Sequence, residues 1–440
     1  MKNYFFKITD HISRKINGDE FAHFYLEGEQ SDFIRFNQNK IRQNGNVVQY
    51  YCTLTLISNN RQASAVITLS NDIEVDLKLF DKALGTLRKT LPKLVEDPYI
   101  LYSTEVNSTY NIEESELPDT LSIVDEVMQK GRKKDLVGIL SSGTIVRAFA
   151  NSLGQKNWFE KSGFSLDWSI YFEKDKAVKS GYAGYKWKNS ELAEKMDQAA
   201  KELSIMKKPA STINPGIYRV YLAPAAVDNF MHIMSWGGFG IKSQKTGNSS
   251  LLKLVEGTKS FNEKINLTEN NLDGSSPLFS DTGFIKPDKI VLVENGNLKE
   301  SLASPRSAKE FEVAQNGANP WEMPESIELS AGGIAHDNIL KTLDSGIYLN
   351  NVHYLNYSDR SNCSMTGMSR FACFEIKNGK IIAPINVMRF DVSLFDMLGD
   401  NFVGATKKRE RMLSTNTYGQ RHTESSHLPG IIVDNFKFTL

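Results

Sequence analysis

The chain lacks long apolar runs and is poor in cysteine, and these two absences exclude whole classes of protein. No segment approaches the roughly 20 apolar residues that a membrane-spanning helix needs, so we expect no membrane partner. The three cysteines, Cys52, Cys363 and Cys373, are too widely spaced to indicate a disulfide framework. The first residues show no secretory signal pattern. Together these features predict a cytoplasmic protein.

A net charge is also absent, because Lys plus Arg and Asp plus Glu both number 52. Proteins that bind duplex DNA usually carry a clustered basic surface, and this balance gives no sign of one. The basic run at 407–411 includes Glu410 and is typical of a solvated loop. We therefore expect no direct contact with nucleic acid.

The remaining composition, 40% hydrophobic and 24% charged, is typical of a globular protein. A length of 440 residues exceeds one ordinary core and predicts two or three domains. Asn59 and Asn60 form a plausible hairpin turn between two alternating segments. Ser190 is the expected cap of an apolar-striped helix. The pattern predicts strands at 21–26, 33–42, 47–57, 62–69 and within 136–185, and helices at 76–94 and 190–206.

The stretch 209–216 contains two prolines, a glycine and small polar residues, which is typical of a linker. Beyond it the sequence predicts short strands and Gly turns in place of long helices. The expected fold class is therefore α+β. We expect an N-terminal α/β layer domain over 1–208 and a mostly antiparallel, barrel-like β-sheet domain over 217–440.

Motifs for catalysis are difficult to find. A zinc peptidase needs several histidine, cysteine or carboxylate ligands and a base for the metal-bound water. His422 and His427 are the nearest approach, but residues five apart lie on different faces of a helix and on opposite faces of a strand. A polar loop is the simpler interpretation. No G-x-S-x-G elbow is present, and the glycines at 237–240 follow a predicted helix instead of a strand.

Several stretches nevertheless resemble the TldD/PmbA family, in the order that the family uses. The resemblance spans nearly the whole chain and rests on the segments 31–37, 330–346, 366–370, 375–384 and 429–436. It implies a two-domain α+β architecture and a dimer that encloses a peptide-accessible cavity. It also implies a role in peptide maturation or degradation, in a family whose members have been called modulators of DNA gyrase.

The sequence departs from this family where metal would bind. In metal-binding members a Leu-Leu pair leads into H-E-x-x-x-H, and a cysteine near the C-terminus completes the zinc site. Here Leu251 and Leu252 are followed by Lys253 and Thr258 in place of the histidines, and by Leu254 in place of the general base. The segment 415–419, near the expected cysteine, contains no thiol. The resemblance therefore implies a subunit that binds no cofactor, with zinc carried by a partner.

Three functional hypotheses follow from these observations. The first is a metal-free subunit that acts on unfolded peptides in a dimer with a TldD-like, zinc-bearing homologue. The second is a peptidase with a different site, built from Glu256, His422 or His427, working alone or as a homodimer. The third is a non-enzymatic modulator that binds gyrase-related toxin systems.

Overall fold

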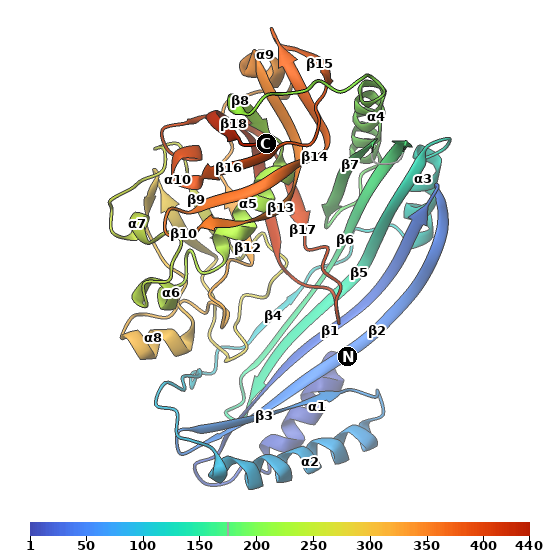
Figure 1. Ribbon diagram of the computed structural model, residues 1–440. Coiled ribbons are helices and arrows are strands. Elements are labelled where there is room, and N and C mark those ends of the chain that lie inside the picture. Colours follow the sequence, from blue (N-terminus) through green and yellow to red (C-terminus); the bar gives the residue numbers. More distant parts are fainter. Residues whose placement is uncertain (174–175) are drawn as a thin grey trace.

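The computed structural model describes residues 1–173 and 176–440 and consists of two β-sheets with helices around them. Figure 1 shows a long, twisted N-terminal sheet that runs diagonally across the molecule, with the C-terminal part packed against its upper end. The α+β fold class predicted from the sequence is confirmed. None of the helices described is long and apolar enough to cross a membrane.

The N-terminal sheet has seven strands in the order β3-β2-β1-β5-β6-β4, with β7 also paired to β6. Its strands are β1 (Phe21–Asn37), β2 (Lys40–Ser58), β3 (Arg61–Thr68), β4 (Thr109–Ile112), β5 (Asp135–Asn151), β6 (Lys156–Glu173) and β7 (Lys176–Gly184). Asn59 and Asn60 form the β2–β3 turn with positive φ, as predicted. The predicted strand 33–42 is instead broken by a second such turn at Gln38 and Asn39.

Four helices cover one face of this sheet. Helices α1 (Lys2–Ser13) and α2 (Ile73–Thr90) pack on its lower half, and α3 (Thr120–Lys130) and α4 (Asn189–Met206) pack on its upper half. Asp72 caps α2 by accepting hydrogen bonds from the N–H groups of Glu74 and Val75. The predicted cap of α4 at Ser190 is wrong by two residues, because the N-cap is Lys188. A short 3₁₀ turn, η1 (Leu91–Lys93), follows α2.

The C-terminal sheet has eleven strands and contains a closed ring. Strands β8, β13, β14, β16 and β18 pair in sequence, and β18 pairs back to β8, which gives the barrel-like form predicted from the sequence. Most pairs are antiparallel; β8–β13 and β12–β18 are parallel. The strands are β8 (Gly216–Leu222), β9 (Leu267–Asn270), β10 (Lys289–Glu294), β11 (Asn297–Leu298), β12 (Ser326–Leu329), β13 (Gly346–Asp359), β14 (Ser364–Lys377), β15 (Lys380–Pro384), β16 (Arg389–Ser393), β17 (Phe402–Leu413) and β18 (Ser425–Phe438).

Short helices lie around this sheet, and one longer helix packs into its core. The longer one, α5 (Pro224–Ser235), follows β8 directly and buries Phe230 and Met231. The others are α6 (Ile241–Lys245), α7 (Leu252–Val255), α8 (Pro305–Phe311), η2 (His336–Asn338), α9 (Ile339–Leu343) and α10 (Leu394–Met397). The basic run 407–411, expected to be a loop, belongs to β17, because Arg409 and Arg411 find acidic partners on neighbouring segments.

The predicted linker 209–216 passes along the surface of the C-terminal part. The N–H of Ser211 donates to the carbonyl of Pro384 at 2.7 Å, and Ile213 is buried in the C-terminal core. A second core joins the two halves, because Trp168 of β6 belongs to the same buried cluster as Phe374 of β14 and Ile432 of β18. The domain boundary stays a prediction, and this shared core means that the two halves are packed together.

Candidate functional site

The residues predicted to replace a zinc motif lie on and just after α7, at the outer edge of the C-terminal part (Figure 1). This helix has a single turn and ends at Val255, so Glu256 and Thr258 lie beyond it. The ammonium of Lys253 donates to Oδ1 of Asn362. Leu254 is 4% exposed and packs into the core.

Glu256 and Thr258 follow this turn, and they do not form a set of metal ligands. The Thr258 hydroxyl donates to the carbonyl of Lys253 at 3.2 Å, and Glu256 is exposed. Zinc in proteins is bound by imidazole, thiolate or carboxylate groups. An ammonium that donates to an amide, a buried leucine and a hydroxyl bonded to the backbone do not fit that ion. The assignment of these positions to the family motif itself stays a prediction.

The loop between β17 and β18, residues 414–424, lies against the N-terminal sheet. Its Arg421 is almost fully buried and donates to Ser31 Oγ at 3.3 Å, to the carbonyl of Gly143 at 3.2 Å and to the carbonyl of Gly163 at 3.0 Å. Ser31, Gly143 and Gly163 are cross-strand neighbours on β1, β5 and β6. This row of small residues makes room for the guanidinium. Burial lowers the pKa of Arg421 to about 10.

Glycine is required at the centre of this row. Gly143 has φ of +140°, and a Cβ there would lie 2.1 Å from the carbonyl oxygen of Gln30. The segment 415–419, near which the resemblance predicts a cysteine, precedes this anchor and carries the exposed Tyr418. Its neighbour Gly419 accepts a 2.8 Å hydrogen bond from Gln49 of β2. The polar contacts of this loop are therefore made mainly with the N-terminal sheet, whereas α7 lies on the opposite side of the C-terminal part.

His422 belongs to the same loop and lies between the two halves. Its Nδ1 is 3.6 Å from Glu424 Oε2, and this polar contact with Glu424 raises the pKa of His422. A narrow cavity beside it is also lined by Lys161 and Tyr185. Lys161 Nζ lies 3.9 Å from the centre of the Tyr185 ring. Lys161 also donates to the carbonyl of Gly274 at 3.0 Å, which is a contact between the two halves.

His427 lies in β18, in a separate cluster. Its Nδ1 is 3.5 Å from Glu328 Oε1 and 4.0 Å from Asp273 Oδ2, and one ligand atom from each of the three residues fits within 4.8 Å. This set resembles a metal centre in composition. However, Arg409 Nη1 lies 3.2 Å from Glu328 Oε2, and Arg411 pairs with Asp273. Two arginines thus already neutralise both carboxylates.

Electrostatics in this cluster favour charge pairing. Burial alone would raise the pKa of Glu328, but polar contacts with His427 and Asn270 and the charge of Arg409 lower it to about 2. Glu328 is therefore ionised and compensated at neutral pH. Within the described residues no hydrogen bond or ion pair joins Glu256, His422 and His427 to one another. The second hypothesis named these three as alternative site residues. Of the three, only His427 lies in a cluster of possible metal ligands.

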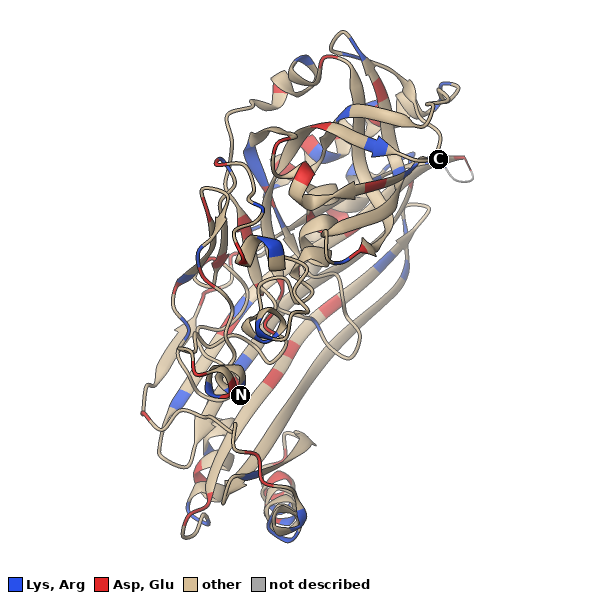
Figure 2. Cartoon of the chain, turned by 60° about the vertical axis from the view of Figure 1, so that its left-hand side comes forward, with Lys and Arg blue, Asp and Glu red and all other residues tan. Residues whose placement is uncertain are grey.

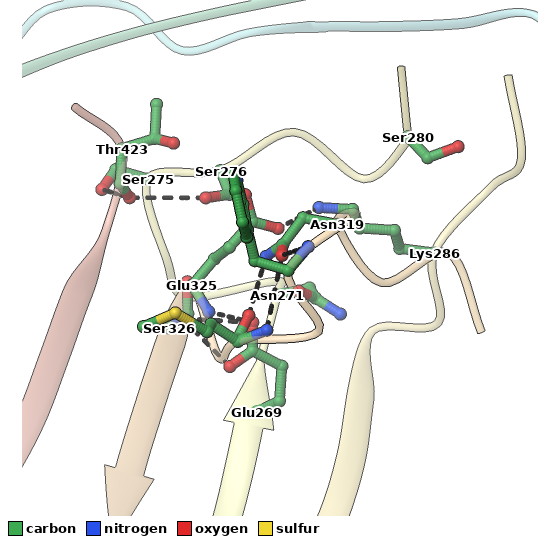
Figure 3. Close-up of polar contacts among 12 residues, drawn as sticks. Glu269, Asn271, Ser275, Ser276, Ser280, Lys286, Asn319, Glu325, Ser326 and Thr423 are labelled. Atoms are coloured by element: carbon green, nitrogen blue, oxygen red, sulfur yellow. Dashed lines mark hydrogen bonds and ion pairs between the residues drawn. The ribbon is translucent and has the colours of Figure 1, made fainter. Parts of the chain in front are cut away.

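A buried polar layer escaped the sequence reasoning (Figure 3). Glu269 of β9 accepts hydrogen bonds from the N–H groups of Glu325 at 2.9 Å and Ser326 at 3.1 Å, and burial raises its pKa to about 7. Lys286, also buried, pairs with the Glu325 carboxylate. Ser275 donates to the carbonyl of Thr423 at 2.8 Å. Spacing gives no signal for this layer, because its members come from strands and loops that are far apart in sequence.

Helix α5 carries a second group that the sequence reasoning missed. Asp228 Oδ1 accepts a 2.6 Å hydrogen bond from Ser426 of β18, and burial raises the pKa of this carboxyl group. His232 lies one helical turn further on and is exposed. The i, i+4 spacing of Asp228 and His232 was a usable signal, because such residues share one face of a helix.

The three thiols are all buried and free. Burial raises the pKa of Cys363 to about 12, that of Cys373 to about 11 and that of Cys52 even further. Since the thiolate is the form that binds metal, none of these groups is prepared to do so. Figure 2 shows Lys and Arg interspersed with Asp and Glu over both halves, so neither half carries charge of a single sign.

The architecture of this chain matches that of several solved structures. A search of curated protein sequences finds no match. Among solved structures, TldE from Thermococcus kodakarensis matches with a TM-score of 0.80 at 15% identity, covering 99% of this chain and 100% of that one. A candidate DNA gyrase modulator from Thermotoga maritima gives 0.77 at 15% identity, with 99% of both chains covered. Another, from Bacteroides thetaiotaomicron, gives 0.75 at 16% identity, with 100% and 98% covered.

These likenesses establish the fold. The family follows from the sequence itself, because residues 215–440 match the model of the PmbA/TldA metallopeptidase C-terminal domain. That span begins at the predicted linker and includes the whole closed ring of strands, α5, α7 and the 414–424 loop. It amounts to more than half of the chain, and the protein belongs to the PmbA/TldD family of metallopeptidases.

Proposed function

We propose that this chain is the metal-free subunit of a peptide-processing dimer whose zinc is carried by a homologous partner. The observation that supports this most is the chemistry at α7. Lys253 offers a positively charged ammonium, which repels a cation, and Leu254 has no atom that could take a proton from water. Ligand and base positions are altered together, so no single substitution would restore the set.

The thiol chemistry of the chain supports the same conclusion. The segment 415–419 offers hydroxyl and amide groups, and the three cysteines are buried elsewhere in the fold. A catalytic zinc site of this family type would need a thiolate at the C-terminal loop. Here the loop is bound to the N-terminal sheet by Arg421 and Gly419. Its contribution is therefore structural, since it fixes the relative position of the two halves.

The substrate in this proposal is an unfolded peptide held in an extended conformation. Such a peptide can add to the edge of a sheet through main-chain hydrogen bonds, which do not depend on its sequence. One half of a dimer can supply the metal-bound water and its base while both halves enclose the substrate. The role of this chain is then to shape the cavity, and the location we propose is the cytoplasm.

A second candidate function is favoured by one observation, the cluster of Asp273, Glu328 and His427. If the two arginines moved away, these residues could bind a cation and support hydrolysis by this chain alone. The geometry argues against it, because Arg409 and Arg411 lie on the same strand, β17, that pairs with β18 at His427. Both arginines are therefore side chains of a paired strand and do not belong to a mobile loop.

The experiment that separates these functions starts with the purified chain. We expect it to carry no tightly bound zinc after dialysis and to show no peptidase activity. Mixing it with a homologue that has an intact H-E-x-x-x-H motif should produce chelator-sensitive cleavage of unfolded peptides. Changing the motif glutamate of that homologue to Gln should abolish the cleavage, whereas Lys253→Ala in this chain should leave most of it.

Three results would contradict this proposed function. One zinc per chain that is lost in His427→Ala and retained in Lys253→Ala would identify the His427 cluster as a metal site and refute the metal-free assignment. Peptide cleavage by this chain alone, unaffected by chelators, would require a metal-independent site. Failure of every mixture to cleave, with both proteins folded and in complex, would exclude the peptide-processing role.

A further inference from the structure

Helix α1 presents basic side chains on the face that points away from the N-terminal sheet. Its buried residues, among them Phe5, Ile8 and Ile12, pack into the core of that sheet. Lys7 and Arg14 are exposed and lie seven residues apart, or two helical turns, so they share the outer face. About 10.5 Å of helix axis separates them. Two positive charges therefore lie along one line on this helix.

An open cleft of about 610 Å³ lies along α1. Tyr110 of β4 and Lys156, the first residue of β6, also line it. Its size is within the range of roughly 300–1,000 Å³ that is usual for small-molecule sites. Figure 1 shows α1 at the lower end of the N-terminal sheet, whereas α7 lies in the C-terminal part. The cleft is thus separate from the positions of the zinc motif and from the 414–424 loop.

The charges in this cleft are unbalanced. Among the described residues that line it, Asp10 is the only carboxylate, and its Oδ1 lies 2.7 Å from Nζ of Lys156. Lys2, Lys7 and Arg14 also line the cleft and have no ion-pair partner in the part of the chain that the structure describes. Three cations are therefore left without a counter-charge, and an anion of small size would supply one.

Two aromatic rings form part of the cleft wall. The ring centres of Phe6 and Tyr110 lie 6.4 Å apart, with an angle of 83° between the planes. Nζ of Lys2 is 5.4 Å from the centre of the Tyr110 ring, so a cation lies beside this ring. Phe6 is almost buried, whereas Tyr110 is 58% exposed. Tyr110 therefore offers an accessible apolar surface to a planar group, next to the positive charges.

We propose that this cleft binds a nucleoside polyphosphate, with its phosphates on Lys7 and Arg14 and its base against Tyr110. The guanidinium of Arg14 can bind phosphate oxygens in a bidentate manner, and the lysines add point charges. Stacking on an aromatic ring tolerates any base, so the site selects the class of ligand and not one nucleoside. The proposal does not depend on the zinc chemistry above.

The surroundings favour a small ligand over a strand of nucleic acid. A strand needs a positive track that continues along the protein surface. Lys15, the next cation after Arg14, is paired with Asp81 at 2.5 Å. Figure 2 shows acidic residues interspersed with the basic ones over the N-terminal half. The unpaired positive charge is thus confined to the cleft.

The test is binding to the whole chain, measured by isothermal titration calorimetry with ATP, inorganic tripolyphosphate and adenosine as probes. We expect ATP to bind saturably, and the other two to bind at least about tenfold more weakly. Lys7→Ala combined with Arg14→Ala should raise the Kd for ATP at least about tenfold, because two phosphate contacts are lost. Tyr110→Ala should raise it at least about fivefold and leave tripolyphosphate binding unchanged.

Lys78→Ala combined with Lys82→Ala is the matched control. Both lysines are exposed on α2 and do not line the cleft, so this variant removes the same charge elsewhere. It should leave the Kd for ATP unchanged. No saturable binding of ATP by the wild type, or equal weakening in the two double variants, would overturn the proposal. Tripolyphosphate bound as tightly as ATP, with Tyr110→Ala without effect, would overturn it in favour of a site for inorganic polyphosphate.

Discussion

Arg421 donates a 3.0 Å hydrogen bond to the carbonyl of Gly163, which joins the loop before the last strand to the middle of the N-terminal sheet. The guanidinium has no carboxylate within ion-pair distance among the described residues and is held by neutral oxygens. Gly143 and Gly163 leave the space that it fills. This buried side chain therefore connects the two halves of the molecule in addition to their shared core.

Arg421→Ala should lower the free energy of unfolding by about 2–4 kcal/mol, because it leaves several buried oxygens without a donor and creates a void. Urea unfolding followed by circular dichroism measures this. Arg14→Ala, at the exposed C-cap of α1, is the matched control and should change stability by less than about 0.5 kcal/mol. Equal effects of the two substitutions would contradict a structural role for Arg421.

Glu269 should make the protein less stable as the pH rises towards neutrality. Its pKa is about 7 in the folded state against 4.5 in the unfolded state, so the folded protein binds the extra proton between those values. Stability is therefore lost as the pH rises from 4.5 to about 7, by up to about 3 kcal/mol from this group.

Glu269→Gln should remove that part of the pH dependence while keeping an oxygen for the N–H groups of Glu325 and Ser326. The free energy of unfolding of both proteins, measured at about pH 5 and about pH 7.5, checks this. Glu256→Gln, at an exposed position, should leave the pH dependence as it is. A wild-type slope retained in Glu269→Gln would show that other buried acids account for it.

Glu328 should act in the opposite direction. Its pKa is lowered from 4.5 to about 2, so its ionised form stabilises the fold above pH 4.5 and that contribution is lost as the pH falls towards 2. Glu328→Gln should therefore destabilise the protein at neutral pH and differ less from the wild type near pH 3. Thermal unfolding at both pH values measures the difference. A constant difference would mean that packing, and not charge, accounts for the cost.

Limited proteolysis should cut first at the predicted linker. Pro209, Thr212 and Asn214 are exposed, as are Lys207 and Lys208 before them. Trypsin cleaves after Lys207 but not at the Lys208–Pro209 bond, so mass spectrometry of the first fragments should give a piece that ends at Lys207. First cleavage within 414–424, with 209–216 intact, would mean that the boundary between the halves lies elsewhere.

Local features were predictable from sequence, and long-range ones were not. The Asn59–Asn60 turn follows from the preference of asparagine for positive φ, and the α4 stripe follows from helical spacing. The β17 strand was missed because its basic side chains pair with Glu328 and Asp273, which are far away in sequence. Without knowledge of those partners, a run of basic residues predicts a solvated loop.

The candidate site shows the same division. The family resemblance pointed to Lys253, Leu254 and Thr258, and their residue chemistry indicated that they do not suit zinc. That Asp273 and Glu328 converge on His427 could not be foreseen, because a parallel β12–β18 pair brings Glu328 and His427 together. The buried layer at Glu269 joins strands β9 and β12 to loops far away in sequence, and no spacing in the sequence connects them.

The position of β18 has a consequence for synthesis on the ribosome. The last strand pairs with β8, β12, β16 and β17, and the loop before it fills the space beside Gly143 and Gly163. The N-terminal sheet is translated long before these residues exist. Its central row of small residues must stay open, and the ring of strands incomplete, until the final stretch emerges. Nascent chains truncated before Arg421 would therefore expose both unfinished surfaces to chaperones and proteases.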